Sequence, residues 1–340
     1  MNLREMQELR EHDYLSPYAS FSDKSLGRDV YEEECDVRPI YQRDRDRILH
    51  AKSFRRLNGK TQVFLSPEGD HYRTRLTHTL EVAQTARTIS RALKLNEDLT
   101  EAIALGHDLG HTPFGHAGER ALNSVCPDGF KHHEQSIRVV EMLEKDGKGL
   151  NLTKEVKDGI LNHQTEGTPS TLEGKVVRFS DKFAYINHDI DDAIRGHIIT
   201  EDNIPREFTD VLGHRLTERL NTLVHDIIIN SMDTFASGKP DIVMSDRAFK
   251  AMKGLREYMF ESVYTNPVAK SQEGKAEVLV KELYGYYMAN PERLPEEYLK
   301  MKAKGQYVSR VVADYVAGMT DRYAIAKYRE LKIPYAWDVY

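Results

Sequence analysis

The stretch best suited to chemistry lies between residues 71 and 133, which hold half of the chain's fourteen histidines. Imidazole is the commonest metal ligand in proteins, and its charge changes near neutral pH. His107 and Asp108 set a nitrogen and an oxygen ligand side by side after an apolar run, so we expect the pair at the end of a buried helix. Gly110 then permits a turn, and Pro113 disfavours continuation of the helix. We therefore predict that the next segment, with His116 and Glu119 on a loop and a first helical turn, folds back toward the pair.

A mononuclear metal site needs ligands from separate elements that converge at about 2.0–2.3 Å from the ion. The candidates are imidazoles and carboxylates on different predicted helices, namely His78, His107, Asp108 and Asp181. Two imidazoles and two carboxylates leave room for water on an octahedral ion, and this donor set suits Mn, Mg, Fe, Ni, Co or Zn without selecting one. The sequence therefore predicts a site for a divalent metal of unspecified element.

A second ordered stretch covers residues 176–195, where polar side chains recur at the spacing of one helical face. This face holds Asp181, Tyr185, His188, Asp189 and Asp192, and a separate apolar stripe lies beside it. An acidic face in water would explain such a row by itself. A tyrosine within the row favours a cleft instead.

The remaining sequence predicts helices that would position these groups. Helices are predicted over 40–57, 76–94, 98–109, 132–145, 176–195, 208–231, 246–263, 271–289, 295–304 and 307–319. Apolar residues recur near every 3.6 positions in 76–94, 176–195 and 208–231. Asp98 is expected to cap its helix, and Thr153 to cap a further helix that runs through His163. Few β signals occur, so we predict an all-α fold with a helical core and a C-terminal helical extension. We expect an irregular N-terminal arm over 1–40, the core over 41–200 and the extension over 201–340.

Composition bounds the location and the partners of this 340-residue chain. Only two cysteines occur, which argues against a disulfide framework and fits the cytoplasm. The charged N-terminus lacks the apolar core of a signal peptide, and no stretch has the length of a membrane span, so no membrane partner is expected. The net charge of −6 gives no overall basic footprint for nucleic acid. A cluster of Lys and Arg over 38–60 leaves weak, local nucleic-acid binding open.

Longer motifs resemble a known family. The spaced His78, His107-Asp108 and Asp181 resemble the pattern of HD-domain phosphohydrolases. Six segments are similar, more specifically, to the bacterial dGTP triphosphohydrolase family: Arg43-Asp-Arg-Asp-Arg-Ile-Leu-His, Phe54-Arg-Arg-Leu, Lys60-Thr-Gln-Val-Phe, Thr74-Arg-Leu-Thr-His78, the run His107 to Glu119, and Asp314-Tyr-Val-Ala-Gly-Met-Thr-Asp321. The similarity extends from about Ser22 to Tyr328, and His133-Glu134-Gln135 resembles the mammalian antiviral branch that carries a SAM domain.

The resemblance implies hydrolysis of a deoxynucleoside triphosphate to a deoxynucleoside and tripolyphosphate. It implies that His116 protonates the leaving 5′-oxygen, that Glu119 orients and charges His116, and that His133 contacts the phosphates or shares the proton transfer. The substrate contacts that it implies are Arg75, Lys182 and members of the 38–60 cluster on the triphosphate, Gln62 on the base, Tyr185 on the sugar, and Asp189 on the 3′-hydroxyl. A ring packed against C2′ would leave no room for a 2′-hydroxyl.

Plainer alternatives stay open at this stage. Glu119 could cap its helix, because acids favour first turns. His111, one turn after His107, could bind phosphate or merely brace the site. The remaining histidines are expected in the core or at the surface: His163 and His188 inside, His71 and His132 outside.

Rival functions also remain. Another HD chemistry, a 5′-nucleotidase or a cyclic nucleotide phosphodiesterase, would use the same metal. A non-hydrolytic dNTP sensor is the rival from a different class, and the presence of both His116 and Glu119 argues against it. Because members of the family assemble into rings or tetramers, we expect a homo-oligomer, with an activating dNTP as a further possible partner.

Overall fold

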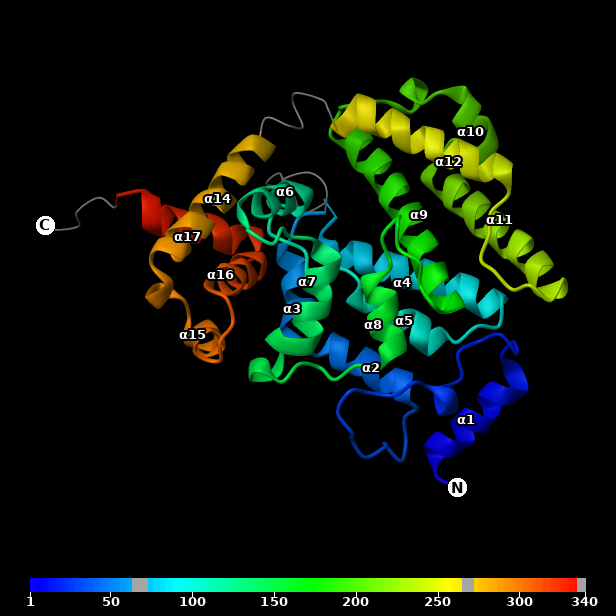
Figure 1. Ribbon diagram of the computed structural model, residues 1–340. Coiled ribbons are helices and arrows are strands. Elements are labelled where there is room, and N and C mark those ends of the chain that lie inside the picture. Colours follow the sequence, from blue (N-terminus) through cyan, green and yellow to red (C-terminus); the bar gives the residue numbers. More distant parts are fainter. Residues whose placement is uncertain (63–72, 265–271, 335–340) are drawn as a thin grey trace, which may run out of the picture.

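The computed structural model describes residues 1–62, 73–264 and 272–334, and its regular elements in these ranges are helices (Figure 1). The described part contains no β-strand. Its only β pairings are isolated bridges, from Arg28 to Thr153 and from Thr61 to Thr74. The all-α prediction is confirmed.

The N-terminal segment is more regular than its sequence suggested. Helix α1 covers Leu3–Tyr14 and begins with a capping box, in which Asn2 accepts from the Glu5 amide and Glu5 accepts from the Asn2 amide. The expectation of an irregular arm is therefore wrong for these residues, because a local cap rather than an apolar stripe starts the helix. The chain beyond α1 is held by buried carboxylates: Glu173, for example, accepts from the backbone N–H groups of Ser20 and Asn96 at 2.9 and 3.0 Å.

Eight helices form the central part, from α2 to α9. Their bounds are Ile40–Leu49 for α2, Lys52–Arg56 for α3, Arg75–Ala92 for α4, Glu97–Gly106 for α5, Gly115–Val125 for α6, His132–Arg138 for α7, Lys154–Leu161 for α8 and Leu172–Arg195 for α9. Helix α5 contacts α2, α4, α8 and α9. Residues 102–106 of α5 are all buried, as expected for a helix whose last turns are apolar on every side. This central position fixes the end of α5, where the His107-Asp108 pair follows.

Helix boundaries differ from the predicted ones at several points. The predicted helix 40–57 is broken after α2, and α7 continues as a π-helical turn over Val139–Leu143. Asn96, not Asp98, caps α5, and its side chain accepts from the amides of residues 98 and 99. The predicted helix 208–231 is broken at Gly213, whose φ of +114° no helix allows. Side-chain periodicity continues across such breaks, so it did not reveal them.

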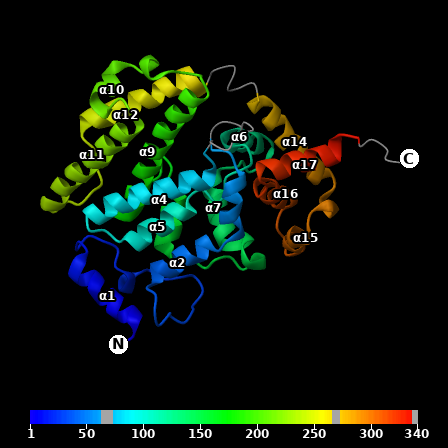
Figure 2. The ribbon, with the colours of Figure 1, turned by 180° about the vertical axis from the view of Figure 1, so that it is seen from behind.

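The later helices lie on two opposite sides of this central part (Figures 1 and 2). On one side are α10 (Arg206–Leu212), α11 (Leu216–Ala236) and α12 (Asp246–Met259), of which α11 and α12 contact α9. On the other side are α14 (Glu273–Ala289), α15 (Glu296–Ala303), α16 (Val308–Ala317) and α17 (Asp321–Lys332). Helix α14 contacts α6, and both contribute to a second apolar core that includes Leu122, Val280 and Val312. Later helices thus pack on both sides of the helices that carry the site. The sequence did not predict α17.

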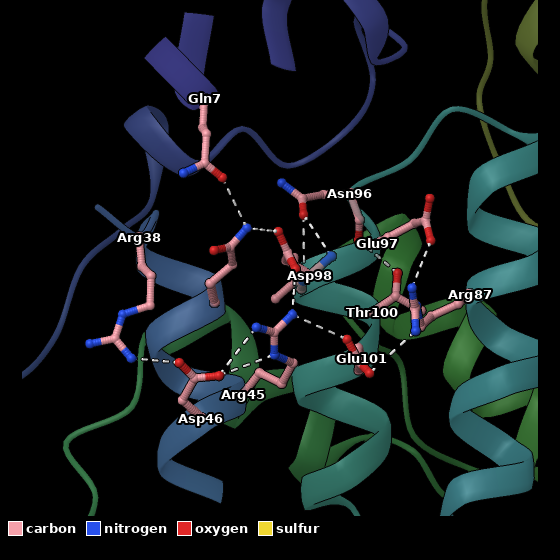
Figure 3. A network of polar contacts seen from close by, with 12 residues as sticks. Gln7, Arg38, Arg45, Asp46, Arg87, Asn96, Glu97, Asp98, Thr100 and Glu101 are labelled. Atoms are coloured by element: carbon pink, nitrogen blue, oxygen red, sulfur yellow. Dashed lines mark hydrogen bonds and ion pairs between the residues drawn. The ribbon is translucent and has the colours of Figure 1, made fainter. Parts of the chain in front are cut away.

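Acidic partners surround much of the basic cluster over 38–60. Figure 3 shows Arg45 between Asp46, Asp98 and Glu101, with its guanidinium 3.0 Å from Asp98. Arg38 pairs with Asp46 at 2.6 Å. Arg43 and Arg47 both pair with one carboxylate, that of Glu32. These guanidinium groups are therefore engaged by the protein's own carboxylates.

Candidate functional site

Three helices bring the predicted metal ligands together. His78 lies in the first turns of α4, which Thr74 caps; His107 and Asp108 follow α5; and Asp181 lies on α9. The Nε2 atom of His78 is 3.1 Å from Oδ1 of Asp181. The Nε2 atom of His107 is 3.4 Å from Asp108 Oδ1 and 3.7 Å from Asp181 Oδ1. Atoms that share one ion at about 2.0–2.3 Å are separated by roughly this much.

The hydrogen bonds of His107 leave one nitrogen open for a cation. Its Nδ1 lies 2.6 Å from the Ala104 carbonyl oxygen and must donate to it, because a carbonyl only accepts. The Nε2 atom, which carries the lone pair in the neutral ring, is buried and has no hydrogen-bond partner among the described residues. A fixed tautomer with a free lone pair beside two carboxylates is what a divalent cation requires. The residues present therefore fit a metal ion, whose element the donor set leaves open.

Both carboxylates are held ionised. Burial opposes the charge of Asp108, but His107 and Arg75 keep the pKa of this carboxyl well below its usual range. Burial likewise opposes the charge of Asp181, and the hydrogen bond from His78 with the charge of His107 lowers its pKa. Two anionic oxygen donors are thus available at neutral pH.

Arg75 is joined to this cluster. Its Nη1 donates to Asp108 Oδ2 at 2.6 Å and its Nη2 to the Gln62 carbonyl at 3.2 Å, with only 2% of the residue exposed. Arg75 also lines the cavity described below. It therefore orients a predicted metal ligand in addition to facing the space where a substrate would lie.

A layer of histidines lies beside the metal cluster. Glu119, on α6, accepts from the His132 amide at 2.8 Å, and its oxygens lie 2.9 Å from His132 Nδ1 and 3.3 Å from His116 Nδ1. The other nitrogen of His132 is 3.3 Å from Nε2 of His163, and its ring stacks on His111 with centroids 4.1 Å apart. The expectation that His132 lies at the surface is wrong.

These hydrogen bonds fix the charges in the layer. His163 Nδ1 donates to the Ile160 carbonyl at 2.7 Å, and burial, with the charges of His107 and His132, lowers the pKa of His163 to about 3. Burial lowers the pKa of His132, but the contact with Glu119 raises it. The net effect is a raised pKa. Burial opposes ionisation of Glu119, but hydrogen bonds from His116 and His132 hold its pKa far below its usual range. Glu119 is therefore an ionised carboxylate shared by two imidazoles.

His133, which the sequence motif singled out, faces elsewhere. It is buried and lies 3.2 Å from the Gln164 side chain, whereas its neighbour His132 lines the cavity. Ser136, one helical turn after His132, donates to the His107 carbonyl and accepts from the Gly110 amide. The face of α7 toward the metal cluster is therefore that of residues 132 and 136. His132 and Ser136 are four residues apart, which places them on one face of a helix. This spacing was the sequence signal that could have found His132.

A cavity of about 310 Å³ opens next to both clusters. Its lining includes His78, Asp108 and Asp181 of the metal cluster, His111, His116, His132 and His163 of the histidine layer, and the predicted substrate residues Gln62, Arg75, Lys182 and Tyr185. Asp189 and His133 are buried and are not among the lining residues. His71 lies outside the described residues.

Comparison with known proteins agrees with this geometry. The HD domain model matches residues 75–186, and the phosphohydrolase-associated domain model matches residues 242–330. A deoxyguanosinetriphosphate triphosphohydrolase-like protein of Caldanaerobacter subterraneus subsp. tengcongensis is 58% identical over 99% of this chain and 98% of its own length. Proteins with the same description from Clostridium perfringens strain 13 and Geobacter metallireducens are 49% and 37% identical, over 98% and 96% of this chain and 98% and 97% of their own lengths.

The chain belongs to the deoxyguanosinetriphosphate triphosphohydrolase-like family. As a member, it is a phosphohydrolase of the HD type, and its HD match begins at the first residue of α4 and ends within α9. This range contains His78, the His107-Asp108 pair and Asp181. None of the helices in the described ranges is long and apolar enough to cross a membrane.

The associated domain of this dGTPase-like chain supplies a wall that the sequence did not reveal. Helix α12 lines the cavity with Phe249, Met252, Lys253 and Arg256. Burial, followed by the charges of Arg178 and Arg256, lowers the pKa of Lys182 to about 8, so cationic groups crowd this wall. An amphipathic helix with lysines and arginines on one face is common on protein surfaces, and nothing in its spacing marks a ligand wall.

Proposed function

We propose that this phosphohydrolase cleaves deoxynucleoside triphosphates, dGTP or a broader set, to a deoxynucleoside and tripolyphosphate, and that it needs a divalent metal. One observation carries the proposal. The four-residue cluster of His78, His107, Asp108 and Asp181 borders a cavity whose rim holds the His116–Glu119 pair and whose wall is cationic. Relatives described as dGTP triphosphohydrolase-like support the choice of substrate class.

The metal site would hold Mn, Mg, Fe, Ni, Co or Zn through these four side chains. Bound there, a divalent ion supplies polarisation of an α-phosphate oxygen and a lowered pKa for a water molecule. Arg75 orients the Asp108 carboxylate by donating to its second oxygen. The contact of His107 Nδ1 with the Ala104 carbonyl leaves the Nε2 lone pair of His107 as a ready nitrogen donor.

The protein's own side chains would carry the proton transfer. A water oxygen would bond to the α-phosphorus while the bond from that phosphorus to the 5′-oxygen breaks, and the 5′-oxygen would take a proton from His116. The proton that the water loses would pass to solvent, from which His116 would be protonated again. Glu119 faces Nδ1 of His116 at 3.3 Å, so the remaining nitrogen, Nε2, is the one that donates. Glu119 would thereby orient the His116 ring toward the 5′-oxygen. His111 and His132, stacked beside it, would contact the phosphates.

The wall of the cavity would recognise the rest of the substrate. Lys182, Lys253 and Arg256 would hold the triphosphate, since each presents a cation to the cavity. Tyr185, on α9, would pack against the sugar and exclude a 2′-hydroxyl, and Gln62 would face the base. Asp189 would bind the 3′-hydroxyl and His133 would take part in proton transfer, in each case after its side chain has moved. Both residues are buried and neither lines the cavity.

We also propose the wider setting that the sequence suggested. A cytoplasmic homo-oligomer is expected, with the extension over 201–340 completing the nucleotide pocket and carrying the subunit interface, and with an activating dNTP as a possible second ligand. Light scattering with and without dNTP measures this assembly. Retention on DNA at low salt measures any weak nucleic-acid binding by residues 38–60.

A product assay decides the reaction. The protein is incubated with each of the four dNTPs in Mg²⁺, Mn²⁺ or Co²⁺, and the phosphate products are separated by anion exchange. Tripolyphosphate with an equal amount of deoxynucleoside is the expected result. Orthophosphate or pyrophosphate would instead identify another HD chemistry, and dNTP-dependent assembly without any product would identify a sensor.

A further inference from the structure

The carboxylate of Asp321, outside the HD match, reaches into the turn that carries His116. Asp321 is the first residue of α17 and is 8% exposed. Its Oδ1 accepts from the Phe114 backbone N–H at 2.9 Å, and its Oδ2 accepts from the Thr61 backbone N–H at 3.0 Å and from the Thr61 hydroxyl. One side chain from the far end of the chain thus receives three hydrogen bonds from two loops of the site.

The turn that it holds has an unusual backbone. Phe114 has a φ of +62° and Gly115 a φ of +54°, and His116 follows as the second residue of α6. An L residue with a side chain rarely adopts the left-handed region, and it persists there only where its surroundings fix it. The hydrogen bond from the Phe114 amide to Asp321 is such a restraint, because it is charge-assisted and lies out of water.

The second loop packs against the first one. A Cβ atom on Gly115 would lie 3.1 Å from the Gln62 carbonyl, so the backbones of the two loops are close. Lys60, in the same loop, is buried and donates to the His111 carbonyl and to the Ala317 carbonyl, the latter at 2.9 Å. The end of α16 and the start of α17 therefore contact the two loops through three residue pairs. Asp321 contacts Phe114 and Thr61, and Ala317 contacts Lys60.

We propose that Asp321 is a positioning residue for the proton donor: it fixes the left-handed turn at Phe114 and thereby the direction in which His116 enters the cavity. The kinetic part of this inference rests on the function proposed above. The structural part does not, since it concerns only the turn. Asp321 itself would touch neither the substrate nor the metal.

Three variants isolate this role. Asp321→Ala removes all three acceptor contacts, and Asp321→Asn keeps one amide oxygen as a milder change. Thr320→Ala is the matched control, because Thr320 caps the same helix by accepting from the Tyr323 amide and leaves the Asp321 carboxylate in place. A further pair of proteins carries His116→Ala with and without Asp321→Ala.

Hydrogen exchange tests the turn without any substrate. Peptides that cover residues 111–120 should exchange faster in Asp321→Ala, by about tenfold or more, and less so in Asp321→Asn, as expected when a local restraint is lost. They should not change in Thr320→Ala. Equal exchange in Asp321→Ala and Thr320→Ala would overturn the structural part, whatever the enzyme's substrate.

Steady-state release of tripolyphosphate tests the kinetic part. Asp321→Ala should lower kcat about 100-fold, as displacements of roughly 1 Å do, with a much smaller change in KM. In the His116→Ala background the same change should alter kcat by less than about threefold, because the group that Asp321 acts through is gone. A further 100-fold loss in that background, or equal kcat values for Asp321→Ala and Thr320→Ala, would overturn it. Absence of tripolyphosphate from the wild type would overturn the proposed function instead, and the exchange result would still stand.

Discussion

The buried ion pair between Asp314 and Arg138 is expected to join the C-terminal helices to the site. Asp314, on α16, is 0% exposed and accepts from Arg138 Nε at 2.8 Å on both oxygens, from Arg138 Nη2 at 2.7 Å and from Gln135 Nε2 at 3.0 Å. Both partners lie on α7, the helix that begins with His132. We predict that Asp314→Ala destabilises the whole chain rather than α16 alone.

The structure sets the size of this effect. Removing one partner of a buried ion pair costs about 3–5 kcal/mol, because the other charge stays behind without its counterion. The Arg138 side chain keeps 14% exposure and a 3.0 Å hydrogen bond to Gln306, which relieve part of this cost. We therefore expect Asp314→Ala to lower the free energy of unfolding by about 3 kcal/mol.

A double-mutant cycle measured by urea unfolding checks the cause. Arg138→Met removes the stranded charge, so the double variant should lose less than the sum of the two single losses, by about 1–3 kcal/mol. Lys300→Ala is the surface control: Lys300 and Glu296 pair at 2.8 Å but are 69% and 81% exposed, so the loss of this pair should leave the urea midpoint almost unchanged. Additive losses, or an Asp314→Ala effect no larger than the control, would refute this reasoning.

Three further predictions concern charge, proton transfer and metal. The Arg47 hydrogen bond lowers the pKa of Glu32 from 4.5 to about 2, so this pair's contribution is present above pH 4.5 and is lost as the pH falls toward 2. Glu32→Gln should cost about 1 kcal/mol at pH 7 after solvent screening, and the difference should vanish near pH 2 in urea unfolding curves. His132→Asn should slow tripolyphosphate release at least about tenfold more than His133→Asn in initial-rate assays, and equal effects would contradict the assignment of His132. Mn²⁺ at 100 times its Kd should stabilise the wild type by about 2.7 kcal/mol in thermal unfolding, and Asp108→Ala should lose this gain.

The sequence predicted the meeting of the four candidate metal ligands, and the physical reason is clear. Imidazole and carboxylate groups that helices bury are expected to face one another, because burial without a partner would be costly. His78 near the start of α4, His107 just after α5 and Asp181 within α9 come from three helices whose apolar periodicity is readable. The all-α class followed from the same periodicity.

The errors also share a cause. Periodicity shows which face of a helix is buried but not what lies against it, so the cationic wall of α12 was missed. Of two adjacent histidines only one can face a given neighbour: His132 contacts Glu119 and His133 contacts the Gln164 side chain, a difference that the motif match did not reveal. Caps depend on local backbone geometry, which is why Asn96 rather than Asp98 caps α5. The other two choices are made by tertiary contacts that no single helix encodes.

Because the chain is synthesised from its N-terminus, the contacts of Asp321 can form only near the end of synthesis. The metal cluster needs residue 181, the cationic wall needs residue 256, and the turn before His116 receives its carboxylate only from residue 321. Contacts this distant along the chain form late, after the earlier helices have collapsed. A nascent or prematurely terminated chain therefore carries every histidine of the site before residue 321 can hold the turn that precedes His116, so any activity that depends on His116 would begin only once synthesis of the protein is almost complete.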